Sequence, residues 1–410
     1  MEFGLIGEHL GHSFSREIHG MITGAPYELR ELAPDELPKF LKDREFRGIN
    51  VTIPYKRAVM PHLDSLADSA RLTGAVNAIV NDGGRLTGHN TDYDGFIALA
   101  RHAGIDFRDS NVVILGAGGA ASAVAAAART MGAASVRHAV RTVREPEQLS
   151  IAAPEQWGDC EILVNATPAG MYPDWNVSPV DIAALPHLRG VLDCIYNPIR
   201  TRLVLDAQER GITAEGGLYM LVGQAVRARE LFDGSNLPES VSEDIFDRIL
   251  RSKRNLVLTG MPSSGKSTVG RELASRSGRR FIDTDEIIAL QAGMEIPEIF
   301  AREGETGFRK RETAAIESLA AEQGVIIATG GGAVMKEENV RLLRHNGIIC
   351  LLERAPELLV PTGDRPLSRD RSALQALYEK RLPRYHAAAE VVIDNNGPLE
   401  RTLAQLEKLC

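Results

Sequence analysis

A phosphate-binding pattern begins about two-thirds of the way along the chain. Residues 260–268 read GMPSSGKST and fit the pattern GxxxxGK[ST]. In this pattern the glycines let backbone N–H groups turn toward a β-phosphate, the lysine reaches the β- and γ-phosphate oxygens, and the next hydroxyl coordinates Mg²⁺. The sequence therefore predicts a site for ATP and Mg²⁺. The residues predicted to form it are Ser263, Ser264, Gly265, Lys266, Ser267 and Thr268, with Ser267 on the metal.

Two carboxylates follow this loop in the segment FIDTDEII, residues 281–288. Asp283 and Asp285 stand two apart around an expected strand end, and side chains two apart on a strand share a face. We therefore expect Asp283 to face the Mg²⁺ held by Ser267, and Asp285 to face a substrate hydroxyl.

The next polar groups suit a small carboxylate ligand. Arg309 and Glu312 are three residues apart in an expected helix, so they can pair and hold the guanidinium rigid. The glycines at 330–332 follow a strand-like run, and their missing side chains permit a small ligand, or simply a tight turn, against the backbone.

A second glycine-rich loop, GAGGAA at residues 116–121, lies between the strand-like NVVIL and the helix-like ASAVAAAARTMG. It resembles the GxGxxG dinucleotide fingerprint, with Ala121 at the third glycine position. An NAD site would place an acidic residue after the next strand, but this chain has arginines and a hydroxyl, which suit a 2′-phosphate. NADP is therefore favoured over NAD. The expected cofactor residues are Gly116, Ala117, Gly118, Gly119, Ala120, Arg141, Thr142 and Arg144.

Four polar blocks precede that loop, namely HSFS at 12–15, GINVTIPYK at 48–56, GAVNA at 74–78 and GHNTDYDG at 88–95. Each places hydroxyl, amide or charged groups at a turn, and a lysine and an aspartate among them could form an acid and base pair. With the later blocks at 165–171, 193–198 and 216–225, they resemble the shikimate dehydrogenase family over roughly residues 1–245.

That resemblance implies NADPH-dependent reduction of 3-dehydroshikimate to shikimate, with Lys56 and Asp92 as the catalytic pair. It implies that Ser13 and Ser15 bind the substrate carboxylate, and that Thr52, Asn77 and Gln224 surround the ring hydroxyls. Asp92 would also hold a hydroxyl. Tyr196 and Gly217 would line the crevice near nicotinamide and substrate. Cys194 would also contact the cofactor.

The second half adds DRPL at 364–367 and RLPRY at 381–385, and over residues 253–410 it resembles shikimate kinase. By this resemblance Arg309, Gly331 and Arg381 bind shikimate, and Asp285 contacts the attacking 3-hydroxyl and acts as a base. Lys266 and Arg365 would assist phosphoryl transfer, with Arg365 on a lid over the nucleotide. The product of the first activity is the acceptor of the second.

The chain departs from both family patterns near the expected ligand groups. Arg16 stands where proline is usual, Ala78 replaces a threonine and Val140 an asparagine, and the lid around Pro361 looks shortened. Three alternatives stay open: a quinate-type dehydrogenase using NAD, another small-molecule kinase, and a kinase-like half that lost turnover and acts as a regulatory module.

The elements that must position these residues fit an α/β protein of two to three domains in 410 residues. We expect a two-lobed dehydrogenase with a catalytic lobe at 1–100 plus 214–247 and a Rossmann-type NADP lobe at 101–213. A junction at 248–254 then leads to a P-loop kinase with a parallel sheet at 255–410. This junction is short, so the two halves should restrict one another.

Composition excludes other classes of partner. A net charge of −8 and a pI near 5.8 argue against nucleic-acid binding. No apolar run approaches about 18 residues and the N-terminus lacks signal-peptide features, so we expect no membrane partner and a cytoplasmic location. The four cysteines lack metal-like spacing and are expected to be free thiols. A homodimer is compatible with the sequence, which does not fix the assembly.

Overall fold

The structure is a computed structural model that describes residues 1–10, 14–360 and 370–410. The chain divides into two compact units, Met1–Ile249 and Leu250–Cys410. The boundary falls inside the helix α8 (Ser240–Lys253). Helical backbone therefore runs through the stretch between the two halves, where the sequence analysis expected a junction.

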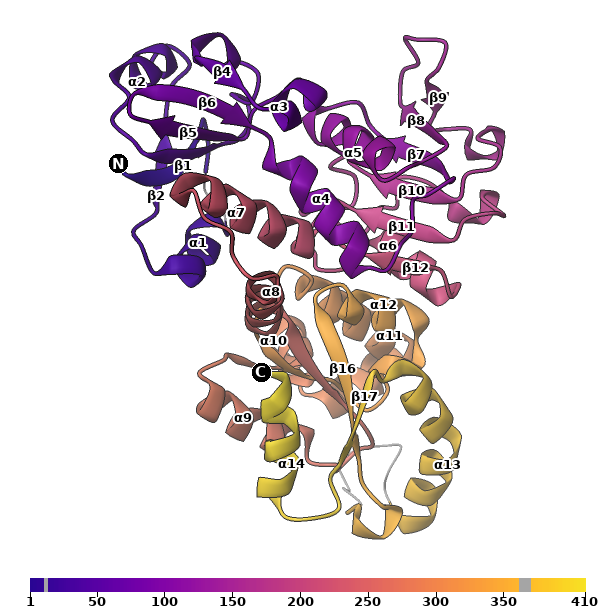
Figure 1. The fold of residues 1–410 in the computed structure, drawn as a ribbon. Coiled ribbons are helices and arrows are strands. Elements are labelled where there is room, and N and C mark those ends of the chain that lie inside the picture. The colour runs from indigo at the N-terminus through magenta and orange to yellow at the C-terminus, as the bar shows by residue number, and fades with distance from the viewer. Residues whose placement is uncertain (11–13, 361–369) are drawn as a thin grey trace. The chain divides into compact units, whose positions relative to one another are not determined.

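The first unit contains two six-stranded sheets (Figure 1). The first sheet has the order β2-β1-β3-β5-β6-β4 and mixes parallel and antiparallel pairs. Its strands are β1 (Phe3–Gly7), β2 (Glu28–Glu31), β3 (Gly48–Val51), β4 (Ser65–Leu66), β5 (Ala78–Asp82) and β6 (Arg85–His89).

The second sheet has the order β12-β11-β10-β7-β8-β9 and is parallel throughout. Its central strands are short apolar runs that are almost fully buried, as expected for a parallel sheet covered on both faces. The strands are β7 (Asn111–Leu115), β8 (Ser135–Val140), β9 (Leu149–Ser150), β10 (Ile162–Asn165), β11 (Gly190–Asp193) and β12 (Thr213–Glu215).

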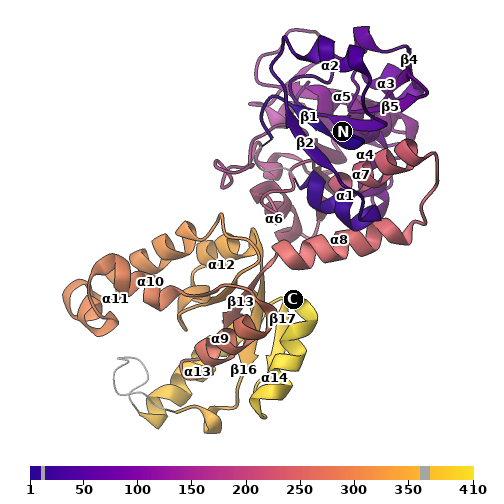
Figure 2. The ribbon, with the colours of Figure 1, turned by 90° about the vertical axis from the view of Figure 1, so that its left-hand side faces the viewer.

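Two helices, α4 and α7, lie side by side between these sheets (Figures 1 and 2). The chain forms α4 before the second sheet and returns to it with α7 after that sheet is complete. The helices of this unit are α1 (Ser15–Thr23), α2 (Leu37–Asp43), α3 (Asp68–Thr73), α4 (Thr91–His102), α5 (Gly119–Thr130), α6 (Arg202–Glu209) and α7 (Leu218–Asp233), followed by α8.

The second unit is built on a five-stranded parallel sheet with the order β14-β15-β13-β16-β17. Its strands are β13 (Asn255–Thr259), β14 (Phe281–Asp283), β15 (Ile326–Ala328), β16 (Gly347–Glu353) and β17 (Val391–Asp394). Its helices are α9 (Lys266–Ser277), α10 (Thr284–Ala292), α11 (Ile296–Ser318), α12 (Glu337–Arg344), α13 (Arg371–Ala388) and α14 (Leu399–Leu406).

In this unit α9 and α14 pack one face of the sheet, where Leu273 and Leu403 join the buried residues of β13 and β16. Helix α11 is kinked at Gly304, whose φ of 66° leaves the helical region. The parallel sheets of both halves confirm the α/β class that the sequence predicts.

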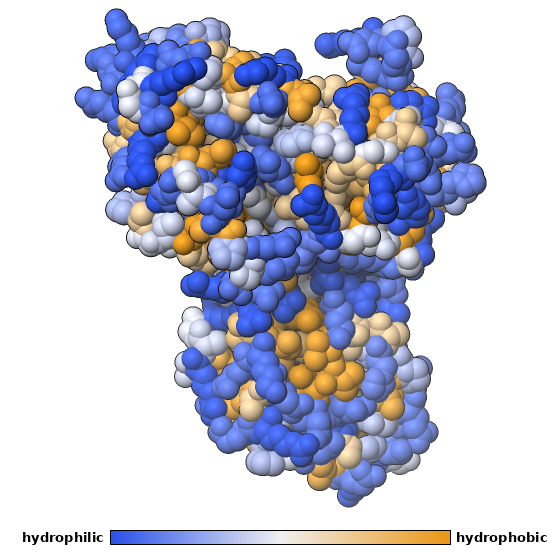
Figure 3. Space-filling view, viewed as in Figure 1, coloured by the Kyte–Doolittle hydropathy of each residue, from blue (hydrophilic) through white to orange (hydrophobic). Residues whose placement is uncertain are grey.

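Hydrophilic residues cover most of the face shown in Figure 3, with apolar residues in smaller patches between them. Of the helices in the described part of the chain, none combines the length and the apolar character that crossing a bilayer requires.

Candidate active sites

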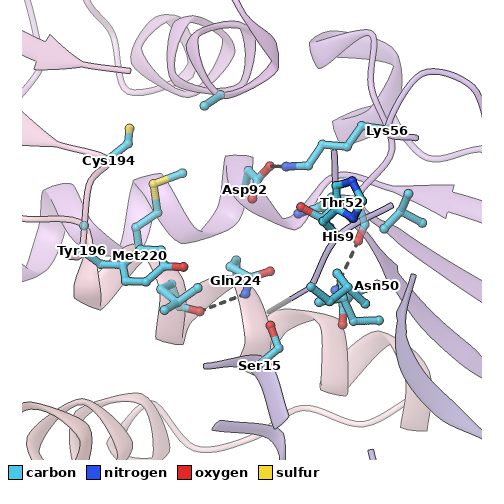
Figure 4. Close-up of a pocket in the computed structure, with 17 residues that line it drawn as sticks. His9, Ser15, Asn50, Thr52, Lys56, Asp92, Cys194, Tyr196, Met220 and Gln224 are labelled. Atoms are coloured by element: carbon cyan, nitrogen blue, oxygen red, sulfur yellow. Dashed lines mark hydrogen bonds and ion pairs between the residues drawn. The ribbon is translucent and has the colours of Figure 1, made fainter. Parts of the chain in front are cut away.

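A pocket of about 560 Å³ lies in the first unit (Figure 4). Ten residues predicted from the sequence line it: Ser15, Thr52, Lys56, Asn77, Asp92, Ala120, Cys194, Tyr196, Gly217 and Gln224. Seven further lining residues were not predicted: Leu5, His9, Leu10, Asn50, Val51, Met220 and Leu221. Ser13 falls outside the described residues. The structure thus brings together groups that are more than 200 positions apart in the chain.

Lys56 and Asp92 point toward each other in this pocket, with Nζ 2.5 Å from Oδ2 (Figure 4). Both side chains are largely shielded, at 23% and 15% exposure. Asp92 lies in the first turn of α4, where the helix dipole favours a carboxylate. The N-cap residue Asn90 accepts a hydrogen bond from the backbone N–H of Tyr93 at 3.3 Å and fixes this turn. The pair has the geometry of a proton donor and the group that orients it.

The amides of the pocket are held by buried partners. The Asn77 Oδ1 accepts from the backbone N–H of Thr91 at 2.6 Å, and Gln224 Nε2 donates to the Leu221 carbonyl at 3.0 Å. The Asn50 Oδ1 accepts from the Tyr27 hydroxyl at 2.8 Å. Sequence analysis missed Asn50, although it stands two residues before Thr52 at the end of a strand, and this spacing signals a shared face.

The glycine-rich loop after β7 leaves room for a phosphate group. Gly116 has a φ of 99°, and a Cβ there would lie 3.0 Å from the side chain of Thr167. A Cβ at Gly118 or Gly119 would meet nothing within 4 Å, so these two positions face open space. Because α5 begins at Gly119, its free N–H groups point toward that space, and they suit the pyrophosphate of a dinucleotide.

Arg141, Thr142 and Arg144 directly follow β8 and are exposed. Because β7 and β8 are parallel neighbours, these residues lie at the sheet edge that also carries the glycine-rich loop. They do not line the 560 Å³ pocket, whereas the predicted cofactor residues Ala120 and Gly217 do. Their two guanidinium groups and hydroxyl fit a 2′-phosphate outside that pocket.

A buried carboxylate, Asp193, supports the wall of the pocket. It is fully buried and accepts hydrogen bonds from the Asn165 amide at 3.1 Å, the Ile195 N–H at 2.9 Å and the Thr201 hydroxyl at 2.7 Å. Burial raises the pKa of this carboxyl to about 6, although the three donors oppose the shift. Asp193 lies in the block at 193–198 that carries the family resemblance, but no role was predicted for this residue.

Asp193 immediately precedes the pocket residue Cys194, and Tyr196 follows. Burial, with a smaller contribution from Asp193, raises the pKa of the Cys194 thiol far above its usual value, so the thiol stays protonated. Burial also raises the pKa of the Tyr196 hydroxyl. Both side chains are therefore neutral walls of the pocket.

A second pocket, of about 150 Å³, surrounds the phosphate-binding pattern in the second unit. Its lining contains Thr329, which was not predicted, together with Ser263, Gly265, Lys266, Ser267, Thr268, Asp283 and Asp285. Ser264, which belongs to the loop, is fully buried, and its carbonyl accepts a hydrogen bond from Asn395 Nδ2 at 2.6 Å. Lys266 begins α9, and its Nζ donates to the carbonyls of Gly260 and Met261 at 3.0 and 2.9 Å. The lysine is thus held against the loop it belongs to.

The metal-binding prediction rests on Ser267 and Asp283, which meet at 2.7 Å between Oγ and Oδ2. One hydroxyl and one carboxylate are a donor set that suits Mg²⁺, which completes its shell with phosphate oxygens and water. The expected strand position of Asp285 is wrong. The strand β14 ends at Asp283, which caps α10 by accepting from the Asp285 N–H at 3.0 Å. Asp285 therefore reaches the pocket from the first turn of a helix.

The residues predicted to bind shikimate, the phosphoryl acceptor, converge on the glycines at 330–332. Arg309 pairs with Glu312 at 2.8 Å, as predicted, and lies so close to Gly332 that a Cβ there would overlap its guanidinium group. Arg381 Nη1 donates to the Gly331 carbonyl at 3.0 Å. A Cβ on Gly330 would lie 2.8 Å from Asp285 Oδ1. Arg365 falls outside the described residues.

Glu312 is fully buried beside this arginine. Burial raises the pKa of its carboxyl and the nearby Asp285 adds to the rise, while Arg309 opposes it. The ion pair with Glu312 fixes the Arg309 guanidinium, which together with Arg381 can recognise a carboxylate.

This fold and these sites define a dehydrogenase with a parallel dinucleotide-binding sheet that is joined to a phosphotransferase of the P-loop class. The comparisons with known proteins agree. The family model described as shikimate dehydrogenase substrate binding domain matches residues 5–79, and the model described as shikimate kinase matches residues 262–408.

Two curated relatives cover the first part of the chain. A protein named shikimate dehydrogenase (NADP(+)) from Clostridium perfringens is 34% identical over an alignment of 267 residues, which covers 60% of this chain and 97% of the relative. A protein of the same name from Carboxydothermus hydrogenoformans is 38% identical over 262 residues, 58% of this chain and 93% of the relative.

Two solved structures are similar over the same part. A chorismate mutase/shikimate 5-dehydrogenase fusion protein from Clostridium acetobutylicum has a TM-score of 0.58 at 33% identity, covering 60% of this chain and 96% of that one. Shikimate 5-dehydrogenase from Thermus thermophilus, in complex with NADP(H) and shikimate, has a TM-score of 0.53 at 33% identity, covering 60% and 99%.

The chain belongs to the shikimate dehydrogenase family and carries a shikimate kinase domain behind the dehydrogenase part. Both predicted families are confirmed. The chain is thus an enzyme with an oxidoreductase part and a phosphotransferase part.

Proposed function

We propose that this chain catalyses two consecutive reactions. The first is NADPH-dependent reduction of 3-dehydroshikimate to shikimate, and the second is ATP-dependent phosphorylation of shikimate to shikimate 3-phosphate. The observation that carries the proposal is the Lys56–Asp92 pair in a pocket lined by hydroxyl and amide groups. The relatives named for NADP(+), and the solved relative in complex with NADP(H) and shikimate, support the choice of cofactor and substrate.

In the first reaction the dinucleotide, when bound, would supply the hydride for the substrate ketone. Lys56 gives its proton to the oxygen on which negative charge develops, and Asp92 holds the ammonium in place and binds a neighbouring hydroxyl. Thr52, Asn77 and Gln224 hold the ring hydroxyls, and Ser15 binds the carboxylate. These contacts orient the ketone before the reaction.

The dinucleotide itself would be held at two places. The open side of the loop at 116–120 and the N-terminus of α5 would bind the pyrophosphate. Arg141, Thr142 and Arg144 would pair with the 2′-phosphate, which would make NADPH a better cofactor than NADH.

In the second reaction catalysis depends mainly on positioning and charge, because phosphoryl transfer requires little covalent chemistry from the protein. Lys266 would turn from its loop carbonyls to the phosphate oxygens, and Ser267 and Asp283 would hold Mg²⁺. Arg309 and Arg381 would bind the shikimate carboxylate beside Gly331. Asp285 would then accept a hydrogen bond from the attacking hydroxyl.

A single assay tests both reactions. Purified full-length protein is given 3-dehydroshikimate, NADPH, ATP and Mg²⁺; NADPH oxidation is followed optically and shikimate 3-phosphate by mass. We expect both signals. Lys56→Ala should slow NADPH oxidation by about 10²–10⁴-fold, the usual contribution of a positioned acid. Lys266→Ala should abolish only the phosphorylated product and serves as the matched control.

Two results would reject parts of the proposal. Equal kcat/KM with NADH and NADPH would reject the role of the arginines after β8. Consumption of NADPH with shikimate left unphosphorylated would favour the alternative in which the second half is a ligand-binding or regulatory module. The sequence feature that raised this alternative, the shortened lid around Pro361, lies outside the described residues.

A further inference from the structure

A third pocket, of about 450 Å³, lies in the first unit and shares no lining residue with the substrate pocket. Helices α4 and α7 line it, and residues of the segment 237–243 line its third side. Its size falls within the range of small-molecule sites. Its lining residues are Asp94, Ile97, Ala98, Arg101, His102, Tyr219, Gly223, Val226, Arg227, Glu230, Leu237, Pro238, Glu239, Ser242 and Glu243.

This pocket and the substrate pocket lie on different faces of the same two helices. Helix α4 contributes Asp92 to the substrate pocket and Asp94 to the third pocket, while α7 contributes Gln224 to one and Arg227 to the other. The helices touch at Gly223, where a Cβ would lie 3.1 Å from Ala98 Cβ. Small residues at this contact leave the floor of the third pocket hollow.

Hydrogen bonds hold the segment 237–243 at both ends. At one end, Glu230 Oε1 accepts from the Leu237 N–H at 2.8 Å. At the other end, Glu243 Oε1 accepts from the Tyr219 hydroxyl at 2.7 Å and lies 3.4 Å from His102 Nδ1. These contacts hold the segment 237–243 against α4 and α7 and so fix the shape of the cavity.

These contacts already use some of the charged groups in the pocket. Arg227 pairs with Glu230 at 2.8 Å and lies 3.9 Å from Asp94. Within the described residues, Arg101 and Glu239 make no ion pair with other side chains. One cation and one carboxylate thus remain for a ligand, beside apolar side chains from both helices.

We propose that this pocket binds a small zwitterion, an α-amino acid with an apolar side chain. Its carboxylate would pair with Arg101, its ammonium with Glu239 and Asp94, and its side chain would pack against Ile97 and Val226. Arg101 and Glu239 are both exposed, and a purely anionic or purely cationic ligand would leave one of these two charges without a partner, so charge complementarity selects a ligand that carries both signs.

Titration calorimetry of the full-length protein tests this site, with L-leucine and L-phenylalanine as probes. The amide and the N-acetyl derivative of each amino acid remove one charge at a time. We expect millimolar or tighter binding of the amino acids only, undiminished by saturating shikimate. Arg101→Gln and Glu239→Gln should each weaken binding about tenfold, the size of a lost charge-assisted hydrogen bond. Arg210→Gln, at an exposed position outside both pockets, should bind as the wild type does.

Three results would overturn the proposal. The first is that neither amino acid binds at millimolar concentration. The second is that shikimate displaces the bound amino acid competitively, which would place the amino acid in the substrate pocket. The third is that the Arg101→Gln variant binds the amino acid as tightly as the Arg210→Gln variant does. None of these results depends on dehydrogenase or kinase turnover.

Discussion

Two aspartates near the substrate pocket show how environment separates similar side chains. Asp92 lies at a helix N-terminus, 2.5 Å from the lysine Nζ, and is placed to hold that lysine. Asp193 is fully buried among neutral donors, and burial raises its pKa to about 6. The first residue suits chemistry, whereas the second suits the positioning of the segment that carries Cys194 and Tyr196.

The raised pKa of Asp193 predicts a pH dependence of stability. The folded state, with a pKa of about 6 against an ordinary value of 3.8, binds the proton more tightly than the unfolded state does. Asp193 therefore favours folding below about pH 4, and this contribution is lost as the pH rises through about 6. Relative to Asp193→Asn, the wild type should lose about 2 kcal/mol of unfolding free energy between pH 4 and pH 7.

Urea unfolding followed by tryptophan fluorescence measures this difference in the first unit alone, because both tryptophans, Trp157 and Trp175, belong to it. A difference between wild type and variant that is independent of pH would contradict the assigned pKa. An Asp193→Asn variant with the same kcat and the same KM for NADPH as the wild type would contradict the positioning role.

At the scale of elements, the close packing of α4 and α7 keeps the substrate pocket in shape. A Cβ on Gly95 would lie 2.6 Å from the Met220 carbonyl and 3.0 Å from Gln224 Cβ. Gly95→Ala should therefore push the helices apart, cost about 1–3 kcal/mol of stability and raise the KM for shikimate. The control is Gly20→Ala in α1, where nothing lies within 4 Å and the change should stabilise by about 0.5–1 kcal/mol.

The tryptophan fluorescence transition and the KM for shikimate serve as readouts for both glycine variants. If Gly95→Ala were as stable as the wild type with the same KM, the contact between the helices would not control the pocket.

Local patterns predicted the elements that we propose to bind phosphate groups. The strand, loop and helix around Gly116 and around Lys266 appear where the sequence indicated, because each motif is continuous in the chain. The placement of Asp285 failed because a strand pattern does not reveal where the next helix begins, and Asp283 starts that helix as its N-cap. His9 and the third pocket could not be predicted, since both depend on contacts between distant segments.

At the scale of the whole molecule, the two units have separate cores and should function separately. A fragment of residues 1–253 should keep the dehydrogenase kcat/KM within about twofold, since a domain with its own core folds alone. A fragment of residues 1–239 lacks Glu243 and Phe246, which pack on Tyr219, and should unfold at lower urea concentration. Equal midpoints for the two fragments would show that α8 contributes nothing to the dehydrogenase unit.

The return of α7 to α4 has a consequence for the newly made chain. Helix α4 ends at His102 and its partner begins at Leu218, so α4 leaves the ribosome before the helix that covers it has been synthesised. At about 5–20 residues per second, this interval lasts on the order of ten seconds. During that time the apolar face of α4 lacks its final cover, and Asp92 at the start of that helix lacks its final surroundings.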